Sequence, residues 1–404
     1  MAECADDAPA WQALGSGYLV MRVFDDWLIL GPARIAFDLR HSQIFATIAT
    51  IPEAYQQERR VLETALQLLI NASGTDPDPV VGPLLAYAAI LETRNAWGPA
   101  ADVYQTVAYG LTDFHGNRQD LASIALVRLR EGQCWRNAQE YEHAVAAYEA
   151  AGMLAEIAKN DVLRLQGRLG LANVARVRGA LPVAETALDE ILEDAERCSL
   201  LVAALLRPAV LHSRGVVRLA RGRYDEALAD LYAAYCDTSD LLERELVLAD
   251  LGACASVACY RDTARNALEV IALTAHRPLA RQFALVNLLE IAVLDENQLA
   301  FERWRSALVL AECIPLAQAH AKLYLARGVE RFQGQDQALS AFQEAAHYAA
   351  TAGIHQVEFE ALGDIDRLKQ AAMAPITAAT PLPPSLSYVG EALAELRVFV
   401  GLKE

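Results

Sequence analysis

The sequence predicts an all-α fold made of a row of helical hairpins, and three observations support this prediction. The chain has 404 residues, of which 54% are hydrophobic but only 7% aromatic, so its apolar content is mostly Ala, Leu and Val. Ala and Leu are strong helix formers. Its 15 Pro and 22 Gly are few for the many tight turns of an all-β fold. In addition, one pattern of small and large residues recurs along the chain.

The recurring pattern is clearest in GVVRLARGRYDEALADLYAAY, residues 215 to 235. Gly215 on a first helix leaves room for a second helix to approach. Gly222 and Arg223 form the turn, and Tyr224 begins the second helix. One face of the second helix then carries residues four and three positions apart, namely Ala227, Leu231 and Ala234. The pattern therefore predicts two antiparallel helices that touch at small residues.

The same pattern is found before and after this segment. Its second strong copy contains Gly132, Trp135, Tyr141, Ala144 and Tyr148. Across all copies, the second helix has a small residue at its contact with the first, namely Ala100, Ala144, Ala184, Ala227, Ala264, Ala300 and Ala338. These markers are 36 to 44 residues apart, which predicts about seven hairpins over residues 79–353.

This pattern resembles the tetratricopeptide repeat, which has a small residue in its first helix and Ala-x3-aromatic-x2-Ala in its second. The resemblance covers about residues 80 to 353, and residues 132–151 and 215–234 match best. It implies an α-α superhelix, a right-handed solenoid of hairpins. Every period exceeds the 34 residues of that repeat, and the aromatic of the first helix is often missing. Lengthened repeats of this kind are similar to those of bacterial signalling regulators.

The two ends of the chain lack the pattern. Residues 1–78 form an N-terminal segment whose first fifty residues we leave open between helix and strand. Residues 53–72 read as an amphipathic helix with a stripe of Val61, Ala65, Leu68 and Leu69. The segment DPDPVVGP, residues 76–83, reads as a break before the array.

After the array we expect a capping helix in residues 354–373, a proline-rich linker in 374–385 and a last helix in 386–404. The last helix has one apolar face, made of Leu386, Val389, Leu393, Leu396 and Val400. It has two possible places to dock, a groove of its own chain or a second copy in a homodimer.

The net charge of −17 disfavours nucleic-acid binding, because an acidic chain repels phosphates. The N-terminus lacks a basic region followed by an apolar one, and no uninterrupted apolar run reaches 18 residues. We therefore expect neither a signal peptide nor a membrane span. The seven cysteines are scattered without a C-x-x-C pair, which favours reduced thiols in the cytoplasm. The strong excess of Arg over Lys favours a bacterial source with a high-GC genome.

Sequence motifs of catalysis or cofactor binding are absent from the chain, including G-x-x-x-x-G-K-[ST], G-x-G-x-x-G, G-x-S-x-G and H-E-x-x-H. His347 and His355 are eight residues apart, and we read them as solvated or capping side chains rather than metal ligands. We expect no catalytic residue, cofactor or metal.

Thirteen arginines lie between residues 128 and 223 of this otherwise acidic chain. The resemblance implies that certain positions of each first helix line a concave groove. Here these positions hold Gln133, Arg136, Asn137, Gln166, Asn173, Arg176 and His212. One interpretation is a groove that binds an acidic peptide or a carboxylate, since arginine binds carboxylates bidentately. The competing interpretation is that these arginines form ordinary ion pairs between repeats.

The leading functional hypothesis is a non-enzymatic scaffold that binds a protein or peptide in its groove, because stacked hairpins form extended concave surfaces. The alternative is a ligand- or peptide-responsive sensor of a bacterial regulatory pathway. An enzyme in the N-terminal segment is a third and weaker hypothesis. Binding of chaperone tails is disfavoured, because the carboxylate clamp of such family members needs Lys and Asn. Leu129 and Leu169 stand three residues before the small residue, where the groove position lies.

Overall fold

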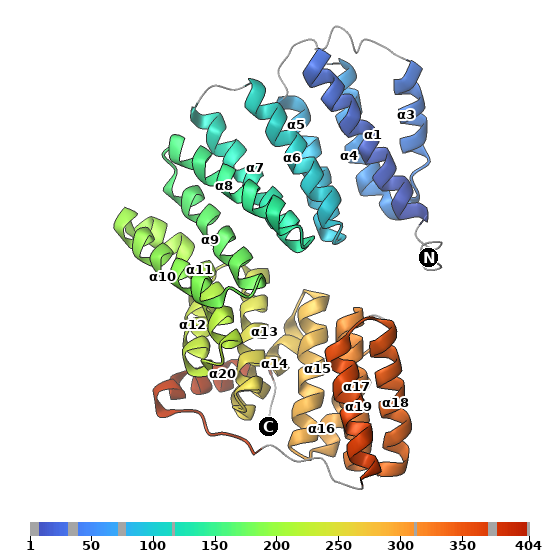
Figure 1. Cartoon of the computed structure of the whole chain (residues 1–404), viewed down its shortest axis with the longest axis vertical. Helices are drawn as coiled ribbons and strands as arrows, with labels where there is room; N and C mark the ends of the chain where they lie inside the picture. Colours follow the sequence, from blue (N-terminus) through green and yellow to red (C-terminus); the bar gives the residue numbers. More distant parts are fainter. Residues whose placement is uncertain are drawn as a thin grey trace. The chain divides into compact units, whose positions relative to one another are not determined.

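The computed structural model describes residues 8–30, 39–71, 78–114, 118–310, 313–370 and 378–401. Within these ranges every regular element is a helix, and consecutive helices pack against one another (Figure 1). The predicted all-α fold of helical hairpins is confirmed. The chain divides into two compact units, residues 1–206 and 207–404, and the boundary lies within helix α11 (Leu200–Ala220). The sequence pattern did not indicate this boundary.

The first unit begins with helices in the segment that the sequence left open. They are α1 (Ala8–Leu30) and α3 (Leu39–Ala49), and α1 packs against α3, α4 and α6. The helices that follow pack in chain order, each on the next: α4 (Gln56–Asn71), α5 (Asp78–Thr93), α6 (Trp97–Phe114), α7 (Arg118–Asn137), α8 (Tyr141–Ile157), α9 (Asp161–Val177) and α10 (Leu181–Cys198).

The second unit continues the same architecture with paired helices. In order these are α12 (Tyr224–Asp237), α13 (Leu241–Val257), α14 (Arg261–Thr274), α15 (Pro278–Leu294), α16 (Gln298–Ala307), α17 (Pro315–Phe332), α18 (Gln335–Thr351), α19 (His355–Lys369) and α20 (Ser387–Phe399). Helices α17, α18 and α19 lie side by side, and α15 packs against α17 (Figure 1).

The small residues of the repeat pattern lie where two helices of one hairpin touch. A Cβ added to Gly215 would lie 2.7 Å from Leu231 Cγ, and one added to Gly252 would lie 2.8 Å from the Leu268 side chain. Such distances are well below van der Waals contact, so these positions require glycine. The physical interpretation of the pattern is therefore confirmed in these hairpins.

The turns within the hairpins place one residue in the left-handed region. Gly179 and Gly222 have φ angles of +80° and +74°, as expected for the residue that ends a helix. In other turns the same conformation is adopted by residues with a side chain, namely Asn95, Gln139, Lys159, Cys259 and Glu296. Because these five residues are not glycine, glycine does not mark their turns in the sequence.

Two details of the N-terminal prediction are wrong. The buried stripe of α4 is Leu62, Ala65, Leu66 and Leu69, whereas Val61 and Leu68 are only partly buried. The helix exists, but its buried face is rotated because α1 and α5 cover two of its sides. The predicted break also lies partly inside α5, which begins at Asp78 and continues through Pro83. Proline at position 79 suits the first helical turn, where its missing N–H has no partner.

The last helix docks on its own chain. Helix α20 packs against α14, where Val389 and Leu393 are buried and the Arg397 guanidinium forms an ion pair with the buried Glu269 carboxylate. Before it, the Thr380 backbone N–H donates a 2.9 Å hydrogen bond to the Cys259 carbonyl. The question of cis or trans packing is thus answered as cis. The capping role of 354–373 and the possible homodimer remain predictions.

Among the described helices, α11 is long and apolar enough to cross a membrane by length and composition, and 28% of its most apolar window is buried. Core helices of soluble proteins meet the same criterion. The expectation that the chain has no membrane span therefore stays a prediction.

Glu245 of α13 holds the backbone just before α15, and this contact depends on pH. The Glu245 carboxylate accepts hydrogen bonds from the backbone N–H groups of His276 (2.9 Å) and Arg277 (3.1 Å) and lies 2.7 Å from the His276 Nδ1 atom. Burial acts to raise the pKa of Glu245, but these hydrogen bonds outweigh it and hold the pKa below its ordinary value.

We expect Glu245→Gln to destabilise the chain at neutral pH and to change little in acid. A depressed pKa contributes stability above the ordinary glutamate pKa of about 4.3, and this contribution is lost as the pH falls further. The difference in urea midpoint between wild type and Glu245→Gln should therefore shrink below about pH 4. The matched control is Glu243→Gln, because Glu243 is an exposed glutamate of the same helix and lies two residues before Glu245. A difference that stays constant from pH 7 to pH 3 would contradict this assignment.

Candidate functional site: a groove between α7 and α9

The ring of Tyr148 holds helices α7, α8 and α9 together. It extends from α8 and is only 4% exposed. A Cβ added to Gly132 of α7 would lie 2.8 Å from this ring, and one added to Gly170 of α9 would overlap it. Two glycines from successive hairpins therefore leave the space that the ring occupies. Helices α7 and α9 both pack against α8 and also contact each other.

A pocket of about 300 Å³ lies over this ring. Helices α7 and α9 contribute most of its lining and α8 contributes Tyr148. The lining residues are Leu126, Leu129, Arg130, Gln133, Arg136, Tyr148, Gln166, Leu169, Gly170 and Asn173. The surface is thus mixed, with leucine side chains beside amide and guanidinium groups. Such a lining suits a ligand that offers both apolar and hydrogen-bonding groups.

The structure brings together four of the seven residues that the sequence proposed for the groove. Gln133 and Arg136 of α7 and Gln166 and Asn173 of α9 all line the pocket. The other three lie elsewhere, as follows.

Asn137 is exposed at the end of α7 and does not line the pocket. Arg176 is partly buried and does not line the pocket, but its Nε atom donates a 3.4 Å hydrogen bond to Oδ1 of the lining residue Asn173. His212 belongs to the second unit, where its Nε2 atom lies 2.7 Å from Asp250 Oδ2. Sequence spacing alone could not show that the array divides into two units before this histidine.

Arg136 is the cation of the pocket that has no carboxylate partner among the described residues. Arg130, in contrast, forms a 3.3 Å ion pair with Glu92 and hydrogen-bonds Gln133. Burial raises the pKa of the Tyr148 phenol, and the nearby Arg136 charge opposes this increase. The guanidinium of Arg136 is therefore close to the buried ring and available to an anion that enters the pocket.

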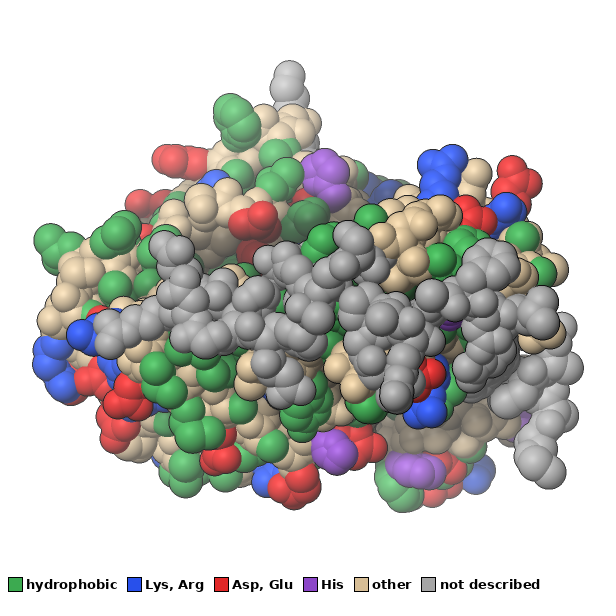
Figure 2. All heavy atoms as spheres, turned by 90° about the horizontal axis from the view of Figure 1, so that it is seen from above, with side chains coloured by type: hydrophobic (Ala, Val, Ile, Leu, Met, Phe, Trp, Pro, Cys, Tyr) green, Lys and Arg blue, Asp and Glu red, His purple; other side chains and the backbone are tan. Residues whose placement is uncertain are grey.

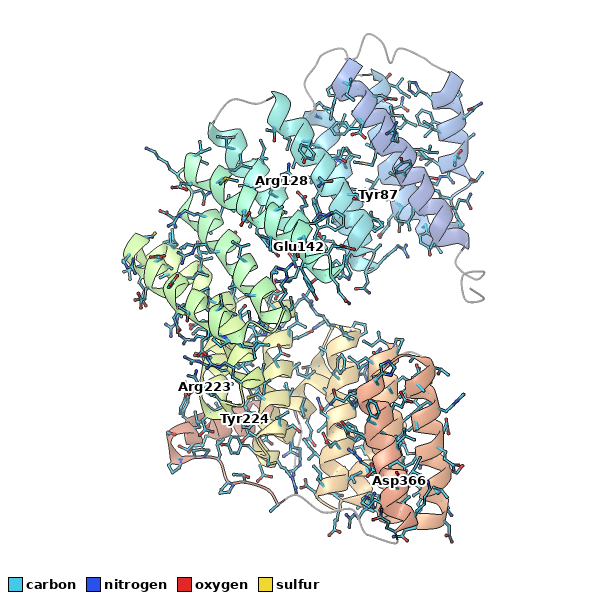
Figure 3. The ribbon with its side chains drawn as sticks, in the orientation of Figure 1. Tyr87, Arg128, Glu142, Arg223, Tyr224 and Asp366 are labelled. Atoms are coloured by element: carbon cyan, nitrogen blue, oxygen red, sulfur yellow. The ribbon has the colours of Figure 1, made fainter. Side chains whose placement is uncertain are left out.

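Most of the arginine cluster forms ion pairs, but mainly within one helix or one hairpin and only at Arg130 and Arg178 between repeats, as the competing interpretation had it. Ten of the thirteen arginines form ion pairs with described carboxylates, namely Arg128, Arg130, Arg164, Arg168, Arg178, Arg197, Arg207, Arg214, Arg218 and Arg223. Asp230, for example, accepts hydrogen bonds from both Arg214 and Arg218 at 2.7 to 2.8 Å. Arg223 pairs with Glu226 next to Tyr224 at the start of α12 (Figure 3). The carboxylate partners of these arginines lie in the same helix, in the same hairpin or in a neighbouring hairpin.

Four lining residues were not named from the sequence at any groove position, namely Leu126, Arg130, Tyr148 and Gly170. Tyr148 belongs to the repeat pattern, which predicts a contact between helices at this position. The pattern does not indicate that the same ring also lines a pocket. Leu126 stands six residues before Gly132, the same spacing that separates Gln166 from Ala172. That shared spacing is the signal from which Leu126 was predictable.

Metal ligands do not cluster in the part of the chain that the structure describes: it contains no group of three or more His, Cys, Asp or Glu side chains able to hold an ion. His355 begins α19 and its Nδ1 atom lies 3.1 Å from Glu358 Oε2 in the first turn of that helix. His347 lies in α18.

Comparison with known proteins gives little beyond the fold. No protein-family model and no curated protein sequence matches the chain. Among solved structures, the chain resembles the crystal structure of a Rap protein complexed with competence and sporulation factor. That match has a TM-score of 0.46 and 12% sequence identity, and it covers 90% of this chain and 98% of that chain. The class assigned here, an all-α helical-repeat protein, rests on the helices and their packing described above.

Proposed function

We propose that the chain is a non-enzymatic scaffold with tetratricopeptide-like repeats and that the groove between α7 and α9 binds an acidic segment of a peptide or protein partner. The observation that supports this proposal is the position of Arg136. It lines the pocket, lies beside the buried Tyr148 ring and has no ion-pair partner among the described residues, whereas most arginines around it are paired.

The lining also favours an amphipathic segment over a simple anion. Leu126, Leu129 and Leu169 provide apolar contacts beside the guanidinium. Gln133, Gln166 and Asn173 offer amide groups that can pair with a peptide backbone. We therefore expect a segment with alternating acidic and aliphatic residues, with a carboxylate at Arg136 and aliphatic side chains at the leucines.

The net charge of the chain sets a condition on binding. The whole chain carries a net charge of −17, so an acidic partner is repelled except where cations gather. On the face drawn in Figure 2, acidic, basic and apolar side chains are interspersed. Affinity for an acidic segment must then come from contacts in the pocket, not from long-range attraction. The described cysteines are free thiols, which suits the reducing cytoplasm that we also propose for this protein.

The proposal is tested by fluorescence anisotropy with a labelled heptapeptide of alternating leucine and glutamate. Arg136→Glu should weaken its binding by at least about tenfold, since a charge-assisted hydrogen bond contributes about 1.5–3 kcal/mol. Arg60→Glu is the matched control, because Arg60 is an exposed arginine of α4 outside the pocket and the change in net charge is the same. Equal affinities for wild type and Arg136→Glu would overturn the proposal.

A further inference from the structure

A second and larger pocket of the first unit lies among helices α1, α5 and α6. Its volume is about 580 Å³. This value falls within the range of sites that hold small organic molecules. The pocket shares no lining residue with the groove between α7 and α9. It is therefore a separate site, and the function proposed for that groove does not use it.

Two glycines of α1 shape this pocket in different ways. A Cβ at Gly17 would overlap the Tyr87 hydroxyl, so glycine at this position lets Tyr87 reach from α5 to α1 (Figure 3). A Cβ at Gly15 would meet no atom within 4 Å, and Gly15 lines the pocket. Gly15 therefore leaves open a volume that a side chain would fill. Glycine inside a helix costs about 1 kcal/mol relative to alanine, and no contact with the described residues requires it at this position.

The walls of the pocket are mainly apolar. Leu14 and Met21 of α1 face Leu91 of α5 and Val103 of α6. Met21, Leu91 and Val103 belong to the buried core of the unit, so these walls are fixed by packing. An apolar ligand group placed between them would lose contact with water on several sides.

Two carboxyl groups lie in the lining, Asp25 on α1 and Asp102 on α6. Neither forms an ion pair or a hydrogen bond with another described side chain. Asp25 is half-buried and Asp102 is largely exposed, and the protein around each carboxyl group removes part of its water and so raises the pKa of both. Arg22 opposes this increase at Asp25 while Asp26 adds to it, and His143 opposes it at Asp102. Burial thus acts against the ionised form of both side chains, and a bound cation would stabilise that form.

The charged groups of the lining are two acids and one base, because Arg22 also lines the pocket. Arg22 is exposed and forms no ion pair with a described residue. Together with the overall charge of −17, this balance favours a cationic ligand over an anionic one.

We infer that the pocket among α1, α5 and α6 binds a small organic cation with an apolar body, an alkyl- or arylamine, whose ammonium group lies at Asp25 and Asp102 and whose body lies between Leu14, Met21 and Leu91. The ammonium group would form ion pairs with the two carboxylates, which have no such partner among the described side chains. The apolar body fills the volume that Gly15 leaves open.

The test is isothermal titration calorimetry of the full chain at pH 7 with decylamine, and with decanoate as the probe of opposite charge and equal length. We expect decylamine to bind, and decanoate to bind at least about tenfold more weakly, because the carboxylates repel it. Asp25→Asn and Asp102→Asn should each weaken decylamine binding several-fold. Asp102 is exposed, so its variant is expected to fold even if the other does not.

A size-matched pair of variants separates binding in the pocket from non-specific uptake. Gly15→Leu should abolish decylamine binding, because its side chain would occupy the pocket. Gly82→Leu should bind decylamine like wild type, because Gly82 does not line the pocket. It is otherwise comparable to Gly15, since it lies in a helix of the first unit and a Cβ there would meet no described atom within 4 Å. No decylamine binding to wild type, equal binding of decanoate, or equal binding to Gly15→Leu and Gly82→Leu would each overturn the inference.

Discussion

Replacement of Tyr148 by alanine is expected to lower the free energy of unfolding by about 3–5 kcal/mol, as for other buried aromatic residues. The ring fills the space that Gly132 and Gly170 leave between three helices, and it is 4% exposed. Its removal would leave a cavity at the junction of α7, α8 and α9. Urea denaturation followed by circular dichroism measures the effect as a lower midpoint. Tyr148→Phe keeps the ring and should stay within about 0.5 kcal/mol of wild type.

A second pair of variants tests the same junction from the glycine side. Gly170→Ala should destabilise the chain although alanine is the better helix former, because the new methyl group would overlap the Tyr148 ring. Gly152→Ala in α8 should stabilise it by up to about 1 kcal/mol, because a Cβ there meets no atom within 4 Å. The two substitutions thus have opposite expected signs. Unchanged midpoints for Tyr148→Ala and Gly170→Ala would contradict the proposed junction.

The other large effect is expected at Glu330 of α17. Its two carboxylate oxygens each lie 2.6 Å from a nitrogen of Arg367 on α19, and the side chains of Glu330 and Arg367 are only 4% and 16% exposed. Glu330→Ala removes one partner of a buried pair, which typically costs 3–5 kcal/mol because the other charge stays buried. Arg367 keeps its 3.0 Å contact with Asp364, so we expect a loss of about 3 kcal/mol.

An exposed ion pair on the same helix serves as the comparison for the buried pair of Glu330 and Arg367. Asp366 and Lys369 also form an ion pair on α19, but their side chains are 69% and 64% exposed (Figure 3 labels Asp366). Asp366→Ala should therefore change the urea midpoint little. The double variant Glu330→Leu/Arg367→Leu should recover much of the stability lost in Glu330→Ala, since it removes both charges. Equal midpoints for Glu330→Ala and Asp366→Ala would show that the pair does not connect α17 to α19.

The fold was largely predictable from the sequence, because the constraint on each hairpin is local. Gly215 and Leu231 are 16 residues apart and meet within one hairpin, so their spacing alone indicates the contact. Helices without such a signal were harder to recognise. Helix α1 contains Asp25 and Asp26 within an apolar stretch, and its neighbours include α6, far along the chain. Its helical character depends on contacts that spacing does not show.

The candidate groove was predictable in part, for a related reason. Gln133 and Gln166 were found because repeat positions determine which side of a first helix is exposed. The sequence could not show which arginines are paired, since partners such as Arg168 and Asp194 lie on different helices. The pocket among α1, α5 and α6 was not predicted, because half of its lining comes from α1, which lies outside the repeat pattern.

The central claim is that an acidic, partly aliphatic segment binds between α7 and α9, and hydrogen–deuterium exchange measures this most directly. Exchange of the full chain should be compared with and without a saturating concentration of the leucine–glutamate heptapeptide. We predict slower exchange in peptides from residues 118–137 and 161–177, and unchanged exchange in residues 315–332 of α17. Unchanged exchange in both α7 and α9, or protection confined to other helices, would contradict the claim.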